Sequence, residues 1–172
     1  MQKQYSSDLL RAQIFKKYLN DRYGWDYDVE HPLADLVPDV DVILKSKTHR
    51  EDLFLQLTEG IKFEATLARG VDGRGVPMFK TGLIREAIEK KEQKYKQQGA
   101  DISNLFLLIF ESLRPEQIDL NISSLKDQKR DFRGIYIISP SFLYGPPSSP
   151  EMTRTQEEWV YEIQNGFSSS PP

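Results

Sequence analysis

The stretch PDVDVIL at residues 38–44, followed after a polar turn by LFLQLTE at residues 53–59, decides the fold of this chain. Side chains two positions apart share one face of a strand, so each run predicts a strand with one aliphatic face to bury. The opposite face carries Asp39 and Asp41 in the first run and Gln56 and Thr58 in the second. The polar residues between the runs have the composition of a hairpin loop, which predicts antiparallel neighbours.

Hydrophobic periodicity predicts two helices. Apolar residues at helical spacing indicate a helix over residues 8–21, with Gly24 ending it, and a second helix over residues 81–98 with Gly99 as its C-terminal cap. Residues 25–32 have aromatic side chains but no clear period, so we interpret them as an ordered connection.

Dense apolar runs at residues 105–110 and 134–138 predict two strands that are buried on both faces. Pro115 starts a helical segment between them that reaches roughly residue 126. The glycine-rich residues 60–80 break any regular pattern and predict an exposed loop that could shape or cover a site. This order of elements predicts an α/β fold, a three-layer sandwich with a central mixed β-sheet flanked by helices.

The composition changes after the last predicted strand. Six of the ten prolines lie from Pro140 onward, together with serine clusters, so we predict an α/β domain at residues 1–139 and a C-terminal extension at residues 140–172. Thr155, with Glu158 three residues later, resembles a capping box. Residues 155–165 are therefore predicted to form a short helix within the extension.

Composition and charge limit the classes of function. The 172 residues suit one domain, and the absence of cysteine excludes disulfides, thiolate zinc sites and cysteine nucleophiles. No apolar run approaches the ~18 residues needed to span a bilayer, so we expect a soluble, cytoplasmic protein without a membrane partner. The formal charge of −3 means that any binding of DNA or RNA would use local basic patches at residues 45–50, 90–96 or 126–133, and solvated surface is the favoured interpretation of each patch.

The strand pair, the lysine-rich helix ending in Lys94-Tyr95 and the aliphatic strand after it resemble the PD-(D/E)xK restriction-endonuclease-like superfamily over residues 36–110. In that family a Pro-Asp strand supplies the first metal-binding carboxylate, and the next strand supplies (Asp/Glu)-x-Lys. The matching positions here are Pro38-Asp39 and Gln56-Leu57-Thr58. The resemblance implies a restriction-endonuclease-like fold and metal-dependent hydrolysis of phosphodiester bonds in nucleic acid.

The chemistry of such a site fixes the roles of the candidate residues. Mg²⁺ or Mn²⁺ would take oxygen ligands from Asp39 and the Gln56 amide, with Asp41 as the better second carboxylate because Glu59 alternates to the other face. Thr58 stands in the lysine position but cannot supply a cation. Lys91, on the same helix face as Ile84, Ile88 and Tyr95, could project its amine into that space, or its chain could instead snorkel to water.

Three interpretations of function remain open at this stage. The chain could be a divergent metal-dependent nuclease with catalytic residues Asp39, Gln56, Thr58 and Lys91, or an inactive nuclease-fold scaffold that binds a protein partner, for example through its C-terminal extension. It could also bind nucleic acid without cleaving it, which predicts a steep salt dependence without any metal requirement. Many domains of this kind form homodimers, but no residue pattern here identifies a dimer interface.

Overall fold

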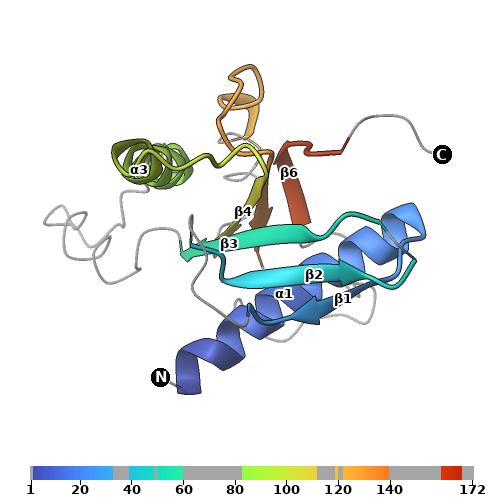
Figure 1. Ribbon diagram of the computed structural model, residues 1–172. Helices are drawn as coiled ribbons and strands as arrows, with labels where there is room; N and C mark the ends of the chain where they lie inside the picture. Colours follow the sequence, from blue (N-terminus) through green and yellow to red (C-terminus); the bar gives the residue numbers. More distant parts are fainter. Residues whose placement is uncertain are drawn as a thin grey trace, which may run out of the picture.

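The computed structural model describes residues 2–32, 39–48, 50–59, 83–111, 119, 122–139 and 160–167. Two long helices and a single sheet make up these residues (Figure 1). The elements are α1 (Gln2–Tyr23), β1 (Tyr27–Glu30), β2 (Val42–Ser46), β3 (Leu53–Glu59), α3 (Leu83–Gln97), β4 (Leu105–Phe110), β5 (Gly134–Ile138) and β6 (Val160–Gln164).

The strands lie in the sheet in chain order, from β1 to β6. The pairs β1–β2, β2–β3 and β5–β6 are antiparallel, whereas β3, β4 and β5 run parallel to one another. The mixed sheet and the β2–β3 hairpin predicted from the sequence are therefore confirmed. Parallel neighbours place the ends of β3, β4 and β5 at one edge of the sheet, next to the start of β2.

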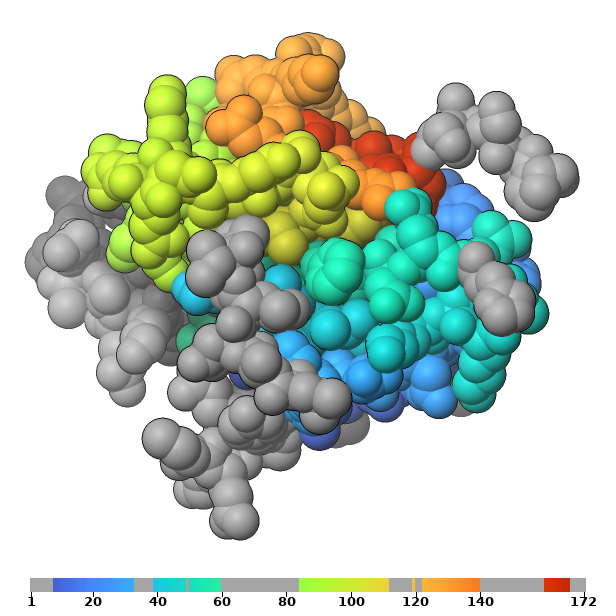
Figure 2. Space-filling model, in the orientation of Figure 1, coloured from blue at the N-terminus to red at the C-terminus, as the bar shows by residue number. Residues whose placement is uncertain are grey.

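Each face of the sheet has its own apolar core. On one face α1 packs through Phe15, Tyr18 and Leu19 against the aliphatic side chains of β2 and β3. On the other face α3 packs through Ile84 and Ile88, together with the segment at residues 122–132. The α3 surface (green to yellow) and that segment (orange) lie next to each other in Figure 2. Helices thus cover both faces of the sheet, as the three-layer prediction required.

The two helices end where the glycines indicated. Gly24 and Gly99 follow α1 and α3 with positive φ angles of 67° and 64°, a conformation that costs glycine little. At the end of α3 the Ala100 N–H donates to the Tyr95 carbonyl at 3.0 Å and the Gly99 N–H to the Lys96 carbonyl at 3.1 Å. These two bonds form a Schellman cap, which fixes the backbone of Tyr95.

Replacing Gly99 with alanine is expected to lower the free energy of unfolding by about 1 kcal/mol. No atom lies within 4 Å of the added Cβ, so the cost comes from the backbone conformation alone. Chemical denaturation of the wild type and the variant measures it. Gly99→Asn is the control, because asparagine tolerates this conformation better than alanine, and equal losses for both variants would contradict the explanation.

Two strands were missed by the sequence interpretation, and one predicted helix is wrong. Residues 25–32 contain the four-residue strand β1, which is too short to show a clear alternation. Residues 160–164 form β6 instead of the end of a helix over 155–165. Val160 and Ile163 are both buried, but in the cores on opposite faces of the sheet. Their three-residue spacing therefore belongs to a strand, and the C-terminal extension supplies the sixth strand of the sheet.

Several predictions fall on residues outside the described part of the chain. These are the strand start at Pro38, the loop at residues 60–80, most of the helical segment after Pro115, and residues 140–159 of the extension. Within the described residues, no helix has both the length and the apolar character needed to cross a membrane. Helix α1 is long enough, but charged residues are spread along it.

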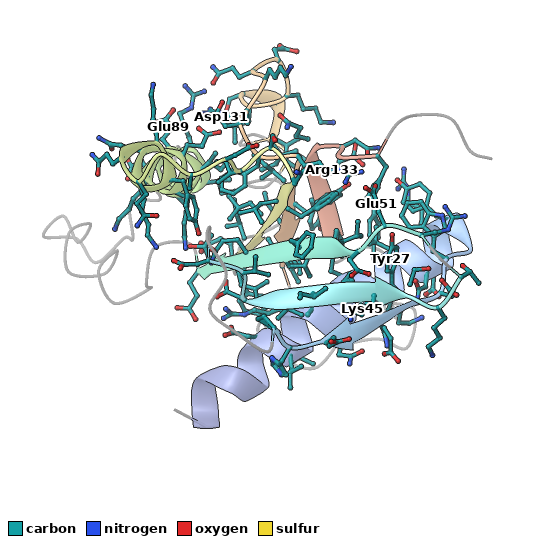
Figure 3. The ribbon with its side chains drawn as sticks, viewed as in Figure 1. Tyr27, Lys45, Glu51, Glu89, Asp131 and Arg133 are labelled. Atoms are coloured by element: carbon teal, nitrogen blue, oxygen red, sulfur yellow. The ribbon has the colours of Figure 1, made fainter. Side chains whose placement is uncertain are left out.

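The edge of the sheet at which β3, β4 and β5 begin is closed by aromatic rings and an ion pair. Phe106 stacks on Phe167 with ring centroids 5.1 Å apart, and the Arg133 guanidinium lies 5.2 Å from the Phe106 centroid. Arg133 also pairs with Glu51, whose carbonyl accepts a 3.0 Å hydrogen bond from the Tyr27 hydroxyl. Tyr27, Glu51 and Arg133 gather there in Figure 3. This edge is filled by packing.

Candidate functional site

Asp41 is the best-anchored carboxylate at the opposite edge of the sheet. Its N–H donates to the Leu55 carbonyl at 2.9 Å. Its Oδ2 accepts a 2.7 Å hydrogen bond from the Leu57 N–H and a second bond from the Gln56 amide nitrogen. No described residue donates a hydrogen bond to Oδ1. The position just before β2 thus fixes the carboxylate against the backbone of β3 and leaves Oδ1 without a donor among the described residues.

Gln56 connects Asp41 to α3. Its side chain is buried on the α3 face of the sheet, with 4% of the residue exposed. The amide nitrogen donates to Asp41, and the amide oxygen accepts a hydrogen bond from the Tyr95 hydroxyl. Burial raises the pKa of Tyr95 to about 12, so this hydroxyl stays protonated and can donate. We call Asp41, Gln56, Lys91 and Tyr95 the Asp41 site.

Lys91 brings a cation to the same place from α3. The side chain is half-buried, and desolvation lowers its pKa, while the charges of Asp41 and Asp39 oppose that shift. No ion pair within 4.0 Å joins Lys91 to a carboxylate of the described residues. Desolvation likewise raises the pKa of Asp41, against the opposing effects of the Leu57 N–H and the Lys91 charge. The predicted position of Lys91 beside the strand carboxylates is therefore consistent with the electrostatics of both groups.

Asp39 and Thr58 make their hydrogen bonds to residues outside the Asp41 site. Asp39 is exposed and pairs with Lys94 at 2.9 Å, with 62% and 45% of the two side chains accessible. An exposed pair of this kind adds little to stability. The Thr58 hydroxyl donates to the Glu59 carbonyl at 3.3 Å and makes no hydrogen bond to Asp41, Gln56 or Lys91. Asp39 stays close enough to Asp41 for its charge to raise the pKa of that carboxyl.

The α1 side of the same edge holds a second group of charges. Arg11 has only 10% of its side chain exposed, pairs with Glu59 at 2.8 Å and with Asp8 at 3.5 Å, and lies 4.3 Å from the Phe110 ring centroid. Glu59 thus serves the α1 face, as its alternation predicted. The Asp8 charge also raises the pKa of Asp41, although desolvation by burial is the larger cause of that shift.

The described residues offer a divalent cation a limited set of ligands. No group of three His, Cys, Asp or Glu side chains among them could hold a metal ion. Asp41 and Asp39 each keep one carboxylate oxygen without a hydrogen-bond donor in the described part of the chain. Gln56, predicted as a ligand, turns its nitrogen to Asp41 and its oxygen to Tyr95, so its oxygen does not face a cation held by Asp41. Asp41 and Asp39 are therefore the candidate ligands among the described residues, two side chains where a group of three is absent.

Some of the cations in the basic patches considered for nucleic-acid binding are held in ion pairs. Lys45 pairs with Glu30 at 3.2 Å and Lys47 with Asp28 at 3.5 Å. Arg130 lies between Glu89 and Glu92 of α3, at 3.6 Å and 3.4 Å. Figure 3 shows Lys45 and Glu89 on separate parts of the surface. These pairs favour the solvated-surface interpretation for the patches at residues 45–50 and 126–133.

Sequence reasoning identified Asp41, Gln56 and Lys91 but gave Tyr95 and Lys94 no role at the site. The spacing of Lys91 and Tyr95, four residues apart on one helix face, was the signal that could have placed the Tyr95 hydroxyl beside Gln56. Arg11 and Asp8 carry no comparable pattern. Comparison of the chain with protein-family models, with curated proteins and with solved structures found no match. The chemistry of the Asp41 site is therefore the basis for a functional proposal.

Proposed function

We propose that the chain is a divergent nuclease-like domain of the PD-(D/E)xK type, whose Asp41 site hydrolyses phosphodiester bonds of DNA or RNA with Mg²⁺ or Mn²⁺. The observation that carries the proposal is the half-buried Lys91 of α3, whose pKa responds to the charges of Asp41 and Asp39 while no ion pair within 4.0 Å joins it to a carboxylate of the described residues. A desolvated cation beside an anchored carboxylate is the kind of arrangement that active sites use. A structural lysine in that environment would gain more by pairing or by reaching water.

Each residue of the Asp41 site would have a distinct role in the proposed hydrolysis. Asp41, with Asp39 beside it, would hold a divalent cation, which polarises the phosphoryl oxygen and activates a bound water near neutral pH. Lys91 would take the part that Thr58 cannot, because its ammonium can stabilise the negative charge that develops on phosphorus as the water oxygen attacks and the bond to the leaving oxygen breaks. Gln56 would contribute through its hydrogen bond to Asp41 and not as a ligand.

A second candidate function rests on the same geometry. The Gln56 nitrogen and the Leu57 N–H already satisfy one oxygen of Asp41, and Lys94 already neutralises Asp39. A site with these internal partners could be the remnant of a catalytic centre on a scaffold that binds protein or nucleic acid. Such a scaffold would bind no divalent cation at Asp41 and would lose nothing when Asp41 is replaced.

The deciding experiment is a cleavage assay with single- and double-stranded DNA and RNA in Mg²⁺ or Mn²⁺. We expect cleavage by the wild type, loss of cleavage with a chelator, and a rate for Asp41→Asn at least about tenfold below that of Asp52→Asn. Asparagine keeps an oxygen that can accept from Leu57, so the first variant should fold. Both substitutions remove one negative charge, and Asp52 is an exposed residue just before β3, at the other end of that strand from the site, which makes Asp52→Asn a matched control.

Three results would count against the proposed nuclease activity. Absence of cleavage on every substrate, together with absence of Mn²⁺ binding by calorimetry, would favour the scaffold. Equal rates for the two variants would show that the anchoring of Asp41 has no catalytic meaning. Binding of nucleic acid without cleavage and without a metal requirement, but with a steep salt dependence, would support the third interpretation.

A further inference from the structure

The hydrogen bonds of the Gln56 side chain have a fixed direction. An ionised Asp41 can only accept hydrogen bonds, so the end of the Gln56 amide that faces it must be the nitrogen. The amide oxygen then faces α3, where the Tyr95 hydroxyl donates to it. The reverse orientation would place an amide oxygen against a carboxylate oxygen and would leave a buried amide nitrogen facing Tyr95. The chain of donors therefore runs from Tyr95 through Gln56 to Asp41.

The Tyr95 ring has a fixed orientation, so its hydroxyl donates in a fixed direction. The residue is 0% exposed, and its ring lies edge-on to Phe132 with centroids 6.3 Å apart. Its backbone carbonyl accepts the Ala100 N–H of the Schellman cap. A buried ring with a fixed backbone has few rotamers, so its hydroxyl has essentially one place to donate.

We propose that Tyr95 is a positioning residue that acts through the Gln56 amide to hold Oδ2 of Asp41, so that Oδ1 is the oxygen presented to the ligand. The proposal deepens the proposed function and depends on it for its catalytic consequence. Tyr95 touches neither substrate nor cation. Its effect on the reaction is to keep the one available carboxylate oxygen in a single orientation, which is the property that small displacements destroy.

The direction of its hydrogen bonds also changes the role that the sequence predicted for Gln56. An amide that donates to Asp41 stabilises the ionised carboxylate without adding a second negative charge. Asp41 is then the anchored carboxylate of the site, and Asp39 lies next to it at the surface. An amide at position 56 therefore holds one carboxylate oxygen of Asp41 in place, whereas a carboxylate at position 56 would repel Asp41.

The test compares Tyr95→Phe with Tyr136→Phe. Both substitutions remove one hydroxyl from a fully buried tyrosine, but Tyr136 belongs to the core on the α1 side of the sheet, opposite to the face that carries Tyr95. The first readout is the side-chain amide of Gln56 by NMR, assigned by its disappearance in Gln56→Leu. We expect Tyr95→Phe to speed exchange of these amide protons about tenfold or more and to shift their resonances, whereas Tyr136→Phe leaves both unchanged.

The second readout is catalysis. We expect Tyr95→Phe to lower kcat about tenfold with KM within about twofold, because the loss is of orientation and not of binding. Tyr136→Phe should keep both parameters. Unchanged Gln56 amide signals in Tyr95→Phe would overturn the proposal whatever the activity.

The two proposals fail separately. If the wild type cleaves nothing, the nuclease function is wrong, and the amide signals still decide whether Tyr95 orients Gln56. If the wild type cleaves and Tyr95→Phe alters the amide signals without changing kcat, the positioning role is overturned while the nuclease function stands. A global loss of structure in Tyr95→Phe would be visible as changes in backbone resonances far from the site, and Tyr95→Leu or Tyr95→Met then replaces it in both readouts.

Discussion

Gly134→Ala is expected to lower the free energy of unfolding by about 2 kcal/mol, within the range for overpacked cores. A Cβ at this position would lie 2.6 Å from Cδ1 of the Phe106 ring. That ring is fully buried and cannot retreat easily, because Phe167 stacks on it and Arg133 lies over it. Denaturation followed by circular dichroism measures the loss, and a cost below about 0.5 kcal/mol would show that the ring adapts.

A double-mutant cycle isolates the cause. In a Phe106→Leu background the phenylalanine ring no longer occupies the space next to position 134. The cost of Gly134→Ala should therefore fall to less than half. Gly166 provides a second check, because a Cβ there would also meet the Phe106 ring. Gly166→Ala should couple to Phe106→Leu in the same direction. Additive costs in both cycles would contradict a clash with Phe106.

The second large effect concerns Lys91. Lys91→Met is expected to lower the rate of phosphodiester cleavage by about 10²–10³-fold, the range seen when one group that stabilises transition-state charge is removed. Methionine keeps most of the length and apolar volume of the lysine chain, so packing on α3 is preserved. The rate is measured under saturating metal and substrate, to separate a loss in kcat from a loss in binding.

Lys90→Met is the matched control for this variant. It removes the same charge from the neighbouring residue of α3, where the side chain is exposed. We expect a change in rate of less than about threefold, attributable to the weaker field around the helix. Equal losses in both variants would mean that the general positive charge of α3 matters and that the position of Lys91 does not.

Stability should respond to Lys91→Met in the opposite sense. Desolvation lowers the pKa of Lys91 from its ordinary value of 10.5, so below its folded-state pKa the charged form costs the native state free energy. The unfolded chain binds the proton more tightly, and the cost therefore fades as the pH rises toward 10.5. The variant should be at least as stable as the wild type at pH 7, with the difference disappearing at alkaline pH. A destabilised variant at pH 7 would contradict this.

The sequence predicted those parts of the fold whose pattern is long or dense. The apolar runs of β4 and β5 are buried on both faces, and the alternation of β3 separates its leucines from Gln56, so these strands were recognisable. The edge strands were not. β1 has four residues, and β6 buries Val160 and Ile163 in different cores at a spacing that a helix also produces. Short strands depend on partners that periodicity does not reveal.

The candidate site shows the same limit. Alternation predicted Asp41 and Gln56 on neighbouring strands, and helical spacing predicted Lys91 near them. The sequence could not show that Asp39 is exposed and paired with Lys94, because that depends on how α3 lies against β2. Nor could it give the direction of the Gln56 amide, which is set by a tyrosine 39 residues later in the chain. The sequence was enough to predict which residues belong to the site. The direction of their hydrogen bonds could be learned only from the tertiary structure.

The order in which the strands are made has a consequence for synthesis. β5 ends at Ile138, but its antiparallel neighbour β6 begins only at Val160. Synthesis of the intervening residues takes on the order of seconds at roughly 5–20 residues per second. Until β6 is in place, β5, all of whose residues are buried in the finished sheet, lacks its outer neighbour and has an open hydrogen-bonding edge. That edge is where wrong pairing with another chain can start.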